Sequence, residues 1–266
     1  MKKYLVVGNP IEHSLSPLIH NYWMNKYNLT DSTYEKKKLD KKDLRNIIDQ
    51  IRNDEIKGVN VTVPFKQEII PFLDKLDKIA KDTRSVNTIC KVNNEVWGYN
   101  TDVKGFDKSL KNVNYKNKNI FILGAGGVTS SIIYNFSFAA KKIYITNRTK
   151  EKADQLKKGD ISGKIEVVDW KQKTEPCDLI INTTSVGLKK DENLNLDFKE
   201  YENKKDILFY DLIYNPKETK FLKDAKLRGN KVMNGKMMFL YQAQTAFKIW
   251  TGISVKIDDE VIKLLD

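Results

Sequence analysis

A glycine-rich turn stands between two apolar segments near the middle of the chain. The strand-like run 120–123 leads directly into Gly-Ala-Gly-Gly at 124–127, and residues 128–140 follow with the pattern of a buried helix. Backbone N–H groups at a helix N-terminus can bind a phosphate, because they point at it and the helix dipole favours negative charge. Tight strand-to-helix turns that bind nothing also use glycines, which is the alternative for this turn taken alone.

The end of the next apolar run indicates which nucleotide would fit. Residues 143–146 lead into Asn-Arg-Thr at 147–149, about twenty residues past the turn, where dinucleotide-binding folds place an Asp or Glu on the ribose 2′-hydroxyl. Here Arg148 stands in place of the carboxylate, with Lys150 and Lys152 close behind. Since Arg binds phosphate oxygens in a bidentate fork, we expect NADP rather than NAD.

A lysine in the first half of the chain is a candidate for proton transfer. Asn60 and Thr62 alternate with valines and would share one face of a strand. Lys66 follows Pro64 at the start of an expected helix over 66–73. A cation is unfavourable at the positive end of a helix dipole, which would help the lysine to give up a proton. The alternative for this segment alone is a surface lysine.

Two further polar residues, Asn87 and Asp102, are each expected to end an apolar strand. A carboxylate beside Lys66 would hold that lysine in its charged form. A Lys66–Asp102 pair is therefore a plausible acid–base unit.

The segment that follows the first strand also carries polar side chains. Ser14 and Ser16 flank one leucine, so an extended backbone would point both hydroxyls at an anion or carboxylate. The alternative is that Ser16 caps the next helix. His13 is the other candidate base, but no carboxylate partner can be placed beside it, and we interpret it as a structural polar residue.

The expected elements form two halves. The first combines strands, helices and a hairpin, at 3–8, 16–27, 32–38, 41–53, 58–63, 66–73, 75–81, 86–92 and 95–99. The second alternates strand and helix at 119–123, 128–140, 142–147, 150–158, 165–168, 179–183 and 207–211, which predicts a doubly wound parallel sheet. Helices over 236–251 and 258–265 complete the chain.

Composition limits the class of protein. The 266 residues are 40% hydrophobic, the longest apolar runs are too short to span a membrane, and Cys90 and Cys177 lack metal or redox spacing. These features favour a cytoplasmic globular protein without a metal. The net charge of +12 raises a nucleic-acid partner as an alternative, but only five of the 47 basic residues are arginines. A solubilising lysine surface is the preferred interpretation.

Taken together, the motifs resemble the shikimate dehydrogenase family from Tyr4 to about Ile262. The resemblance is carried by segments in the family's order and spacing, at 8–17, 60–66, 86–88, 100–102, 124–127, 147–149, 182–187, 211–214 and 241–244. It implies NADP-dependent reversible reduction of 3-dehydroshikimate to shikimate, in aromatic amino-acid biosynthesis. The implied partners are these small molecules, with no nucleic acid or membrane, in a monomer or homodimer.

The resemblance also implies roles for individual residues. Lys66 and Asp102 match the catalytic pair. The substrate would be bound by Ser14, Ser16, Asn60, Thr62, Asn87, Tyr214 and Gln242. The cofactor would be bound by Gly124, Ala125, Gly126, Gly127, Val128, Asn147, Arg148, Thr149, Lys152, Thr183, Leu212 and Gly235.

The implied architecture is an α/β substrate domain over 1–102 and 237–266, with a Rossmann NADP-binding domain over 103–236. The C-terminal helices would return to the first domain. Lys152 stands where an arginine often assists the 2′-phosphate, and Met237 replaces a glycine. A quinate/shikimate relative that uses NAD would carry an acidic residue at the 147–149 tip, which is absent.

Overall fold

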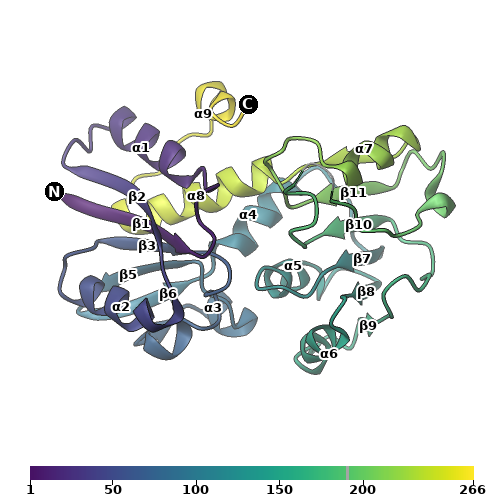
Figure 1. Cartoon of the computed structure of the whole chain (residues 1–266), viewed down its shortest axis with the longest axis horizontal. Coiled ribbons are helices and arrows are strands. Elements are labelled where there is room, and N and C mark those ends of the chain that lie inside the picture. Colours follow the sequence, from purple (N-terminus) through teal and green to yellow (C-terminus); the bar gives the residue numbers. More distant parts are fainter. Residues whose placement is uncertain (190–191) are drawn as a thin grey trace. The chain divides into compact units, whose positions relative to one another are not determined.

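The computed structural model describes residues 1–189 and 192–266, which divide into two compact units (Figure 1). Unit 1 comprises Met1–Lys108 and Leu240–Asp266, and unit 2 comprises Ser109–Phe239. The chain passes between the units within helix α4 (Thr101–Ser109) and again within α8 (Lys236–Thr251). No helix in the described ranges is long and apolar enough to cross a membrane.

Unit 1 contains a mixed six-stranded sheet in the order β2-β1-β3-β5-β6-β4. The first three strands in that order run parallel, and β3, β5 and β6 pair antiparallel. The strands are β1 (Lys2–Gly8), β2 (Ser32–Lys38), β3 (Gly58–Val61), β4 (Lys75–Leu76), β5 (Thr88–Val92) and β6 (Glu95–Tyr99). The remaining helices are α1 (Ser16–Lys26), α2 (Leu44–Arg52), α3 (Lys78–Thr83) and α9 (Asp259–Lys263), with a 3₁₀ turn η1 (Lys41–Asp43).

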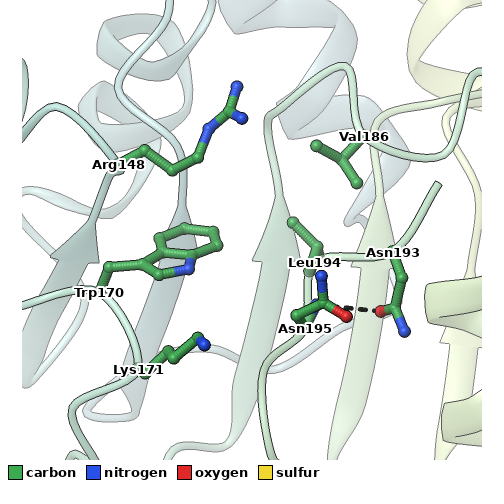
Figure 2. Close-up of a pocket in the computed structure, with 7 residues that line it drawn as sticks. All are labelled: Arg148, Trp170, Lys171, Val186, Asn193, Leu194 and Asn195. Carbon is green, nitrogen blue, oxygen red and sulfur yellow. Dashed lines mark hydrogen bonds between the residues drawn. The ribbon is translucent and has the colours of Figure 1, made fainter.

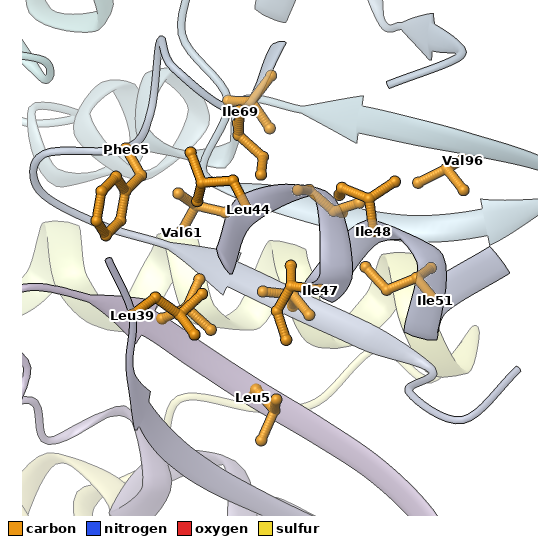
Figure 3. Close-up of a cluster of buried hydrophobic side chains, with 14 of the residues drawn as sticks. Leu5, Leu39, Leu44, Ile47, Ile48, Ile51, Val61, Phe65, Ile69 and Val96 are labelled. Atoms are coloured by element: carbon orange, nitrogen blue, oxygen red, sulfur yellow. The ribbon is translucent and has the colours of Figure 1, made fainter. Parts of the chain in front are cut away.

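Helix α2 supplies one side of the unit 1 core (Figure 3). Leu44, Ile47, Ile48 and Ile51 recur at the spacing of one helix face and are each at most 1% exposed. They belong to the same buried cluster as Val61 and other strand residues. Each such side chain contributes about 1.5–3 kcal/mol through burial, so this face holds the helix on the sheet.

The C-terminal segment is part of unit 1. The Trp250 indole N–H of α8 donates to the carbonyl of Ile89 on β5 at 3.1 Å, and its ring lies 5.4 Å from that of Tyr4. A Cβ on Gly58 would lie 2.5 Å from the Trp250 ring, so only glycine allows this approach. Helix α8 therefore packs on the sheet whose strand β3 carries Asn60.

A buried histidine lies in the same aromatic cluster. His20 of α1 is 0% exposed and stacks on Tyr34 with ring centroids 4.3 Å apart. Neither of its ring nitrogens has a hydrogen-bond partner among the described residues. Burial disfavours the charged imidazolium and lowers the pKa of His20 to about 3.

We expect this histidine to make the protein sensitive to acid. The folded pKa lies below the unfolded value of about 6.5, so stability is lost as the pH falls, by about 1.4 kcal/mol per pH unit below 6.5. His20→Phe keeps the aromatic packing and removes the titration. In denaturant unfolding at pH 7 and pH 5, the wild type should lose about 2 kcal/mol more than the variant over this interval. His13→Gln, at an exposed histidine, is the control. Equal losses in wild type and His20→Phe would contradict the assignment.

Unit 2 contains an all-parallel six-stranded sheet, which confirms the predicted doubly wound fold. The strand order is β12-β11-β10-β7-β8-β9, so the topology reverses beside β7. The strands are β7 (Asn119–Leu123), β8 (Lys142–Thr146), β9 (Ile165–Val167), β10 (Leu179–Asn182), β11 (Leu208–Asp211) and β12 (Lys231–Met233). Helices α5 (Thr129–Phe136), α6 (Lys150–Lys158) and α7 (Lys220–Leu227), with a 3₁₀ turn η3 (Lys199–Tyr201), connect them. Ligands bind such sheets at the carboxyl ends of strands next to the reversal.

Several local expectations are wrong, beginning with the segment that carries Lys66. Residues 63–69 form consecutive turns in place of the expected helix over 66–73, and only Ile70–Phe72 form a 3₁₀ turn, η2. Pro71 explains this, because proline lacks an N–H and disfavours helical geometry in the residue before it. Lys66 therefore does not begin a helix, and the helix-dipole argument for it fails.

The strand ends also differ from the expected ones. Asp102 lies in the first turn of α4, because β6 already ends at Tyr99, and Asn87 precedes β5 rather than ending a strand. Strand β3 ends at Val61, and Val63 is 57% exposed. Helices α4 and α7 and strand β12 were not expected from the sequence, and Lys75–Leu76 form strand β4 where a helix over 75–81 was expected.

Candidate active site

A buried ion pair joins Lys66 and Asp102 within unit 1. The Lys66 ammonium donates to Asp102 Oδ2 at 2.6 Å, and the two residues are only 8% and 6% exposed. The Lys66 turn is fixed because its carbonyl accepts from the Val86 N–H at 2.9 Å. Asp102 is fixed by α4, where its N–H donates to Asn100 Oδ1 at 3.1 Å. A pair held from both sides is pre-organised for proton transfer.

Asn87 connects this pair to the start of α4. Its amide group donates to Asp102 Oδ1 and to Thr101 Oγ1, both at 2.9 Å. Its Oδ1 accepts from the Thr101 N–H at 2.8 Å. The amide orientation of Asn87 is therefore set by donors and acceptors on both of its ends.

Asn60 extends the network to the aromatic cluster. Its amide group donates to the Asn87 carbonyl and to Thr88 Oγ1, each at 3.0 Å, and its Oδ1 accepts from the Tyr34 hydroxyl at 2.7 Å. Both amide hydrogens are thus used inside the protein. These contacts hold the backbone of Asn87 in place. In the Asn60 side chain, only Oδ1 can accept a further hydrogen bond.

The members of this network that were not predicted as site residues include Thr88, Thr101 and Tyr34. Thr101 is 1% exposed and lies inside the Asn-Thr-Asp motif at 100–102, so its position next to Asp102 was the available signal. Tyr34 lies on β2 among lysines, and its aromatic ring gave no sign of a bond to Asn60.

The predicted carboxylate-binding serines lie at the start of α1. The backbone at Leu15 has φ −93° and ψ 4°, so the expected extended geometry is wrong, and the Ser16 N–H donates to Ser14 Oγ at 3.3 Å. Leu15, not Ser16, occupies the cap position of the helix. His13 is exposed in the preceding turn.

Two other predicted substrate residues lie in unit 1, and one lies in unit 2. Thr62 directly follows β3, where its N–H donates to the Val7 carbonyl at 2.9 Å, and Gln242 is half-buried on α8. Tyr214 belongs to unit 2, where its ring stacks on Phe239 at 4.2 Å.

The glycine turn of unit 2 has the geometry of a phosphate cradle. Gly124 has φ +111°, a region that favours glycine, and a Cβ there would lie 2.7 Å from Thr183 Oγ1. A Cβ on Gly126 would meet no atom within 4 Å, so a ligand can approach that backbone. Thr183 donates to the Leu123 carbonyl at 2.9 Å and thereby holds the turn against β10. Val128 follows as the cap of α5.

Asn147 ties this turn to the tip of β8. Its Oδ1 accepts from the Ala125 N–H at 3.2 Å, and its amide group donates to the Thr149 carbonyl at 2.7 Å. Arg148 and Lys152 are exposed beside it, which suits a phosphate group on the ribose. These residues fit a dinucleotide with a 2′-phosphate.

A buried carboxylate organises the loops after β10 and β11. Asp211 is 0% exposed and accepts from Thr219 Oγ1 at 2.6 Å, the Ile213 N–H at 3.0 Å and the Asn182 amide at 3.1 Å. Burial, partly offset by these donors, raises the pKa of Asp211 to about 6. The contacts fix the chain on both sides of Leu212.

Leu212 in turn packs directly on Gly235. A Cβ at Gly235 would overlap the Leu212 carbonyl, so this close approach requires glycine. Leu212 and Gly235, both predicted to bind the cofactor, are therefore neighbours in the structure.

Among the described residues, no group of three metal-ligating side chains occurs. Both cysteines are buried and unpaired, and burial raises the pKa of each thiol to about 11, which suppresses the nucleophilic thiolate.

The phosphate cradle and the buried Lys–Asp pair together define the class, a dinucleotide-dependent oxidoreductase.

Comparisons with known proteins specify the family. The model of the shikimate dehydrogenase substrate binding domain matches residues 6–89, and the shikimate/quinate 5-dehydrogenase model matches residues 107–227. The NADP⁺ shikimate dehydrogenase of Pelagibacter ubique is 51% identical over 100% of this chain and 99% of its own length.

Two solved structures are similar over the whole chain. A shikimate dehydrogenase in complex with NADP⁺ has a TM-score of 0.90 at 35% identity, with 100% of this chain and 94% of that one covered. The enzyme of Thermus thermophilus, in complex with NADP(H) and shikimate, has a TM-score of 0.87 at 29% identity, with 100% and 98% covered.

The chain belongs to the shikimate dehydrogenase family. Its activity is NADP-dependent shikimate dehydrogenase activity in the shikimate pathway, which leads to the aromatic amino acids. The expected family, activity and cofactor are thus confirmed.

Proposed function

We propose that the Lys66–Asp102 pair carries out the proton transfer of this reaction. NADP supplies or accepts the hydride when it is bound. In reduction, the Lys66 ammonium donates a proton to the substrate oxygen as the carbonyl becomes a hydroxyl. In oxidation the Lys66 amine takes this proton up, and the Asp102 carboxylate holds the resulting ammonium. The observation that carries the proposal is the buried 2.6 Å contact between Lys66 Nζ and Asp102 Oδ2.

We further propose that the remaining polar residues of unit 1 bind the substrate. Ser14 and Ser16 would donate to its carboxylate, and Thr62, Asn87 and Gln242 would bind its hydroxyls. Asn60 and Asn87 each already use both amide hydrogens inside the protein, so Asn60 would accept from a substrate hydroxyl through Oδ1, and Asn87 would exchange an internal contact for the substrate. Tyr214 would assist at the carboxylate.

The cofactor is proposed to bind through unit 2. The pyrophosphate would lie on the backbone of the glycine turn, which comprises Gly124, Ala125, Gly126, Gly127 and Val128. Asn147, Arg148, Thr149 and Lys152 would surround the 2′-phosphate. Thr183, Leu212 and Gly235 would line the nicotinamide side.

These assignments give each of the two units its own role. Unit 1 would be the substrate-binding domain and unit 2 the NADP-binding domain, close to the expected bounds at 102/103 and 236/237. We also propose a cytoplasmic monomer or homodimer, since reduced buried cysteines suit that compartment.

Steady-state kinetics test the proposed function. The purified chain should reduce NADP with shikimate as the only other substrate, and kcat/KM for NADP should exceed that for NAD by roughly tenfold or more. Quinate in place of shikimate should support a much lower rate. Equal rates with quinate or with NAD would favour the broader quinate/shikimate relative instead.

A further inference from the structure

A cavity of about 370 Å³ lies beside Arg148 in unit 2 (Figure 2). One wall is formed by Arg148, Trp170 and Lys171, and the facing wall by Val186 and residues 193–195. None of the residues that line it carries a carboxylate. The cavity therefore combines two cations, one indole ring and side-chain amides, which suits an anionic aromatic ligand.

The wall that carries Trp170 and Lys171 is a tight turn after β9. The Gln172 N–H donates to the Asp169 carbonyl, and the Asp169 N–H donates to Gln172 Oε1, both at 3.0 Å. Lys171 has φ +73°, an unusual conformation for a residue with a side chain, which costs about 1–3 kcal/mol. The two hydrogen bonds hold the turn in spite of this cost.

The same turn is fastened to the tip of β8. Lys150 Nζ donates to Asp169 Oδ1 at 2.6 Å. This ion pair occupies both the Lys150 ammonium and the Asp169 carboxylate. Among the described residues Arg148 and Lys171 have no ion-pair partner, and both line the cavity. Lys171 is thus the second cation available there.

We propose that Lys171 and Trp170 are further specificity residues for the cofactor. Lys171 binds the 2′-phosphate together with Arg148, and Trp170 packs against the adenosine. The proposal rests on the proposed placement of NADP at Arg148, and it assigns a role to a turn that none of the sequence motifs includes.

Binding of two small nucleotides tests this role. Adenosine 2′,5′-bisphosphate carries the 2′-phosphate and 5′-AMP lacks it. Trp170 is the one tryptophan of unit 2, so its fluorescence can report binding of both probes. Lys171→Gln should weaken the bisphosphate about tenfold and leave 5′-AMP nearly unchanged. Lys173→Gln, which removes an exposed cation two residues away, is the matched control.

Two outcomes would overturn the proposal. One is Lys171→Gln binding the bisphosphate as tightly as wild type, and the other is equal weakening in Lys171→Gln and Lys173→Gln. Trp170→Phe should abolish the fluorescence change, and a persistent change would remove Trp170 from the site. If the wild type binds the bisphosphate through Lys171 but does not oxidise shikimate, the proposed function is contradicted. The role of Lys171 in binding would stand in that case.

Discussion

Lys66→Ala is expected to lower kcat for shikimate oxidation by about 10²–10⁴-fold. The alcohol proton then has no basic side chain to receive it, while the groups proposed to bind substrate and cofactor remain. The effect should fall on kcat, with the KM for NADP nearly unchanged. Removing one partner of a buried ion pair is also destabilising, by about 3–5 kcal/mol. Lys66→Gln should therefore be measured as a second variant, because glutamine can still donate a hydrogen bond to Asp102.

A second lysine of unit 1 provides the matched control. Lys91 donates to Asp54 Oδ2 at 2.6 Å, the same distance as in the Lys66 pair, but Asp54 is largely exposed. Lys91→Ala should leave kcat within a few-fold of wild type, because exposed pairs contribute about 0–1 kcal/mol. The assignment of Lys66 is contradicted if either Lys66 variant keeps near-native turnover, or if its whole defect is weaker shikimate binding.

Arg148→Ala is expected to remove most of the preference for NADP. A charge-assisted bond to the 2′-phosphate contributes about 1.5–3 kcal/mol, so kcat/KM for NADP should fall by about 10- to 150-fold. The value for NAD should change little, since NAD has no 2′-phosphate, and it serves as the internal control. The measurement is the ratio of the two kcat/KM values in wild type and variant. A variant that keeps its NADP preference would show that another group binds the phosphate.

The glycine turn between β7 and α5 could be predicted from sequence because its determinants are local. A strand, a glycine turn and a helix follow one another directly, and parallel sheets bring successive strand ends to one edge. The bonds from Ala125 to Asn147 and from Thr183 to Leu123 then bring the three strand ends together. The helix expected over 41–53 is likewise present as α2, whose buried residues recur on one face.

The sequence allowed Lys66 and Asp102 to be paired, and they do form an ion pair, but their local structure could not be predicted. Lys66 was expected at the start of a helix and lies in a turn, and Asp102 was expected at the end of a strand and lies in a helix. Pro71 disfavours the helix expected over 66–73. The support from Tyr34 through Asn60 to Asn87 depends on strand neighbours far apart in the chain, and no local pattern encodes it.

The cavity beside Arg148 shows the same limit. Its walls come from loops after three different strands, β8, β9 and β10, whose side chains meet only in the folded unit. The conformation of Lys171 depends on the bonds between Asp169 and Gln172, which single-residue preferences do not predict.

Chemical rescue of Lys66→Ala tests the central claim most directly. Small primary amines should enter the space left by the side chain and accept the substrate proton. We predict that kcat for shikimate oxidation rises with amine concentration and with amine basicity, while the KM for shikimate stays nearly constant. Lys91→Ala should not respond to the same amines. Turnover of Lys66→Ala that is independent of every amine in the series, or that is already near wild type without one, would contradict the role of Lys66 as the proton-transfer group.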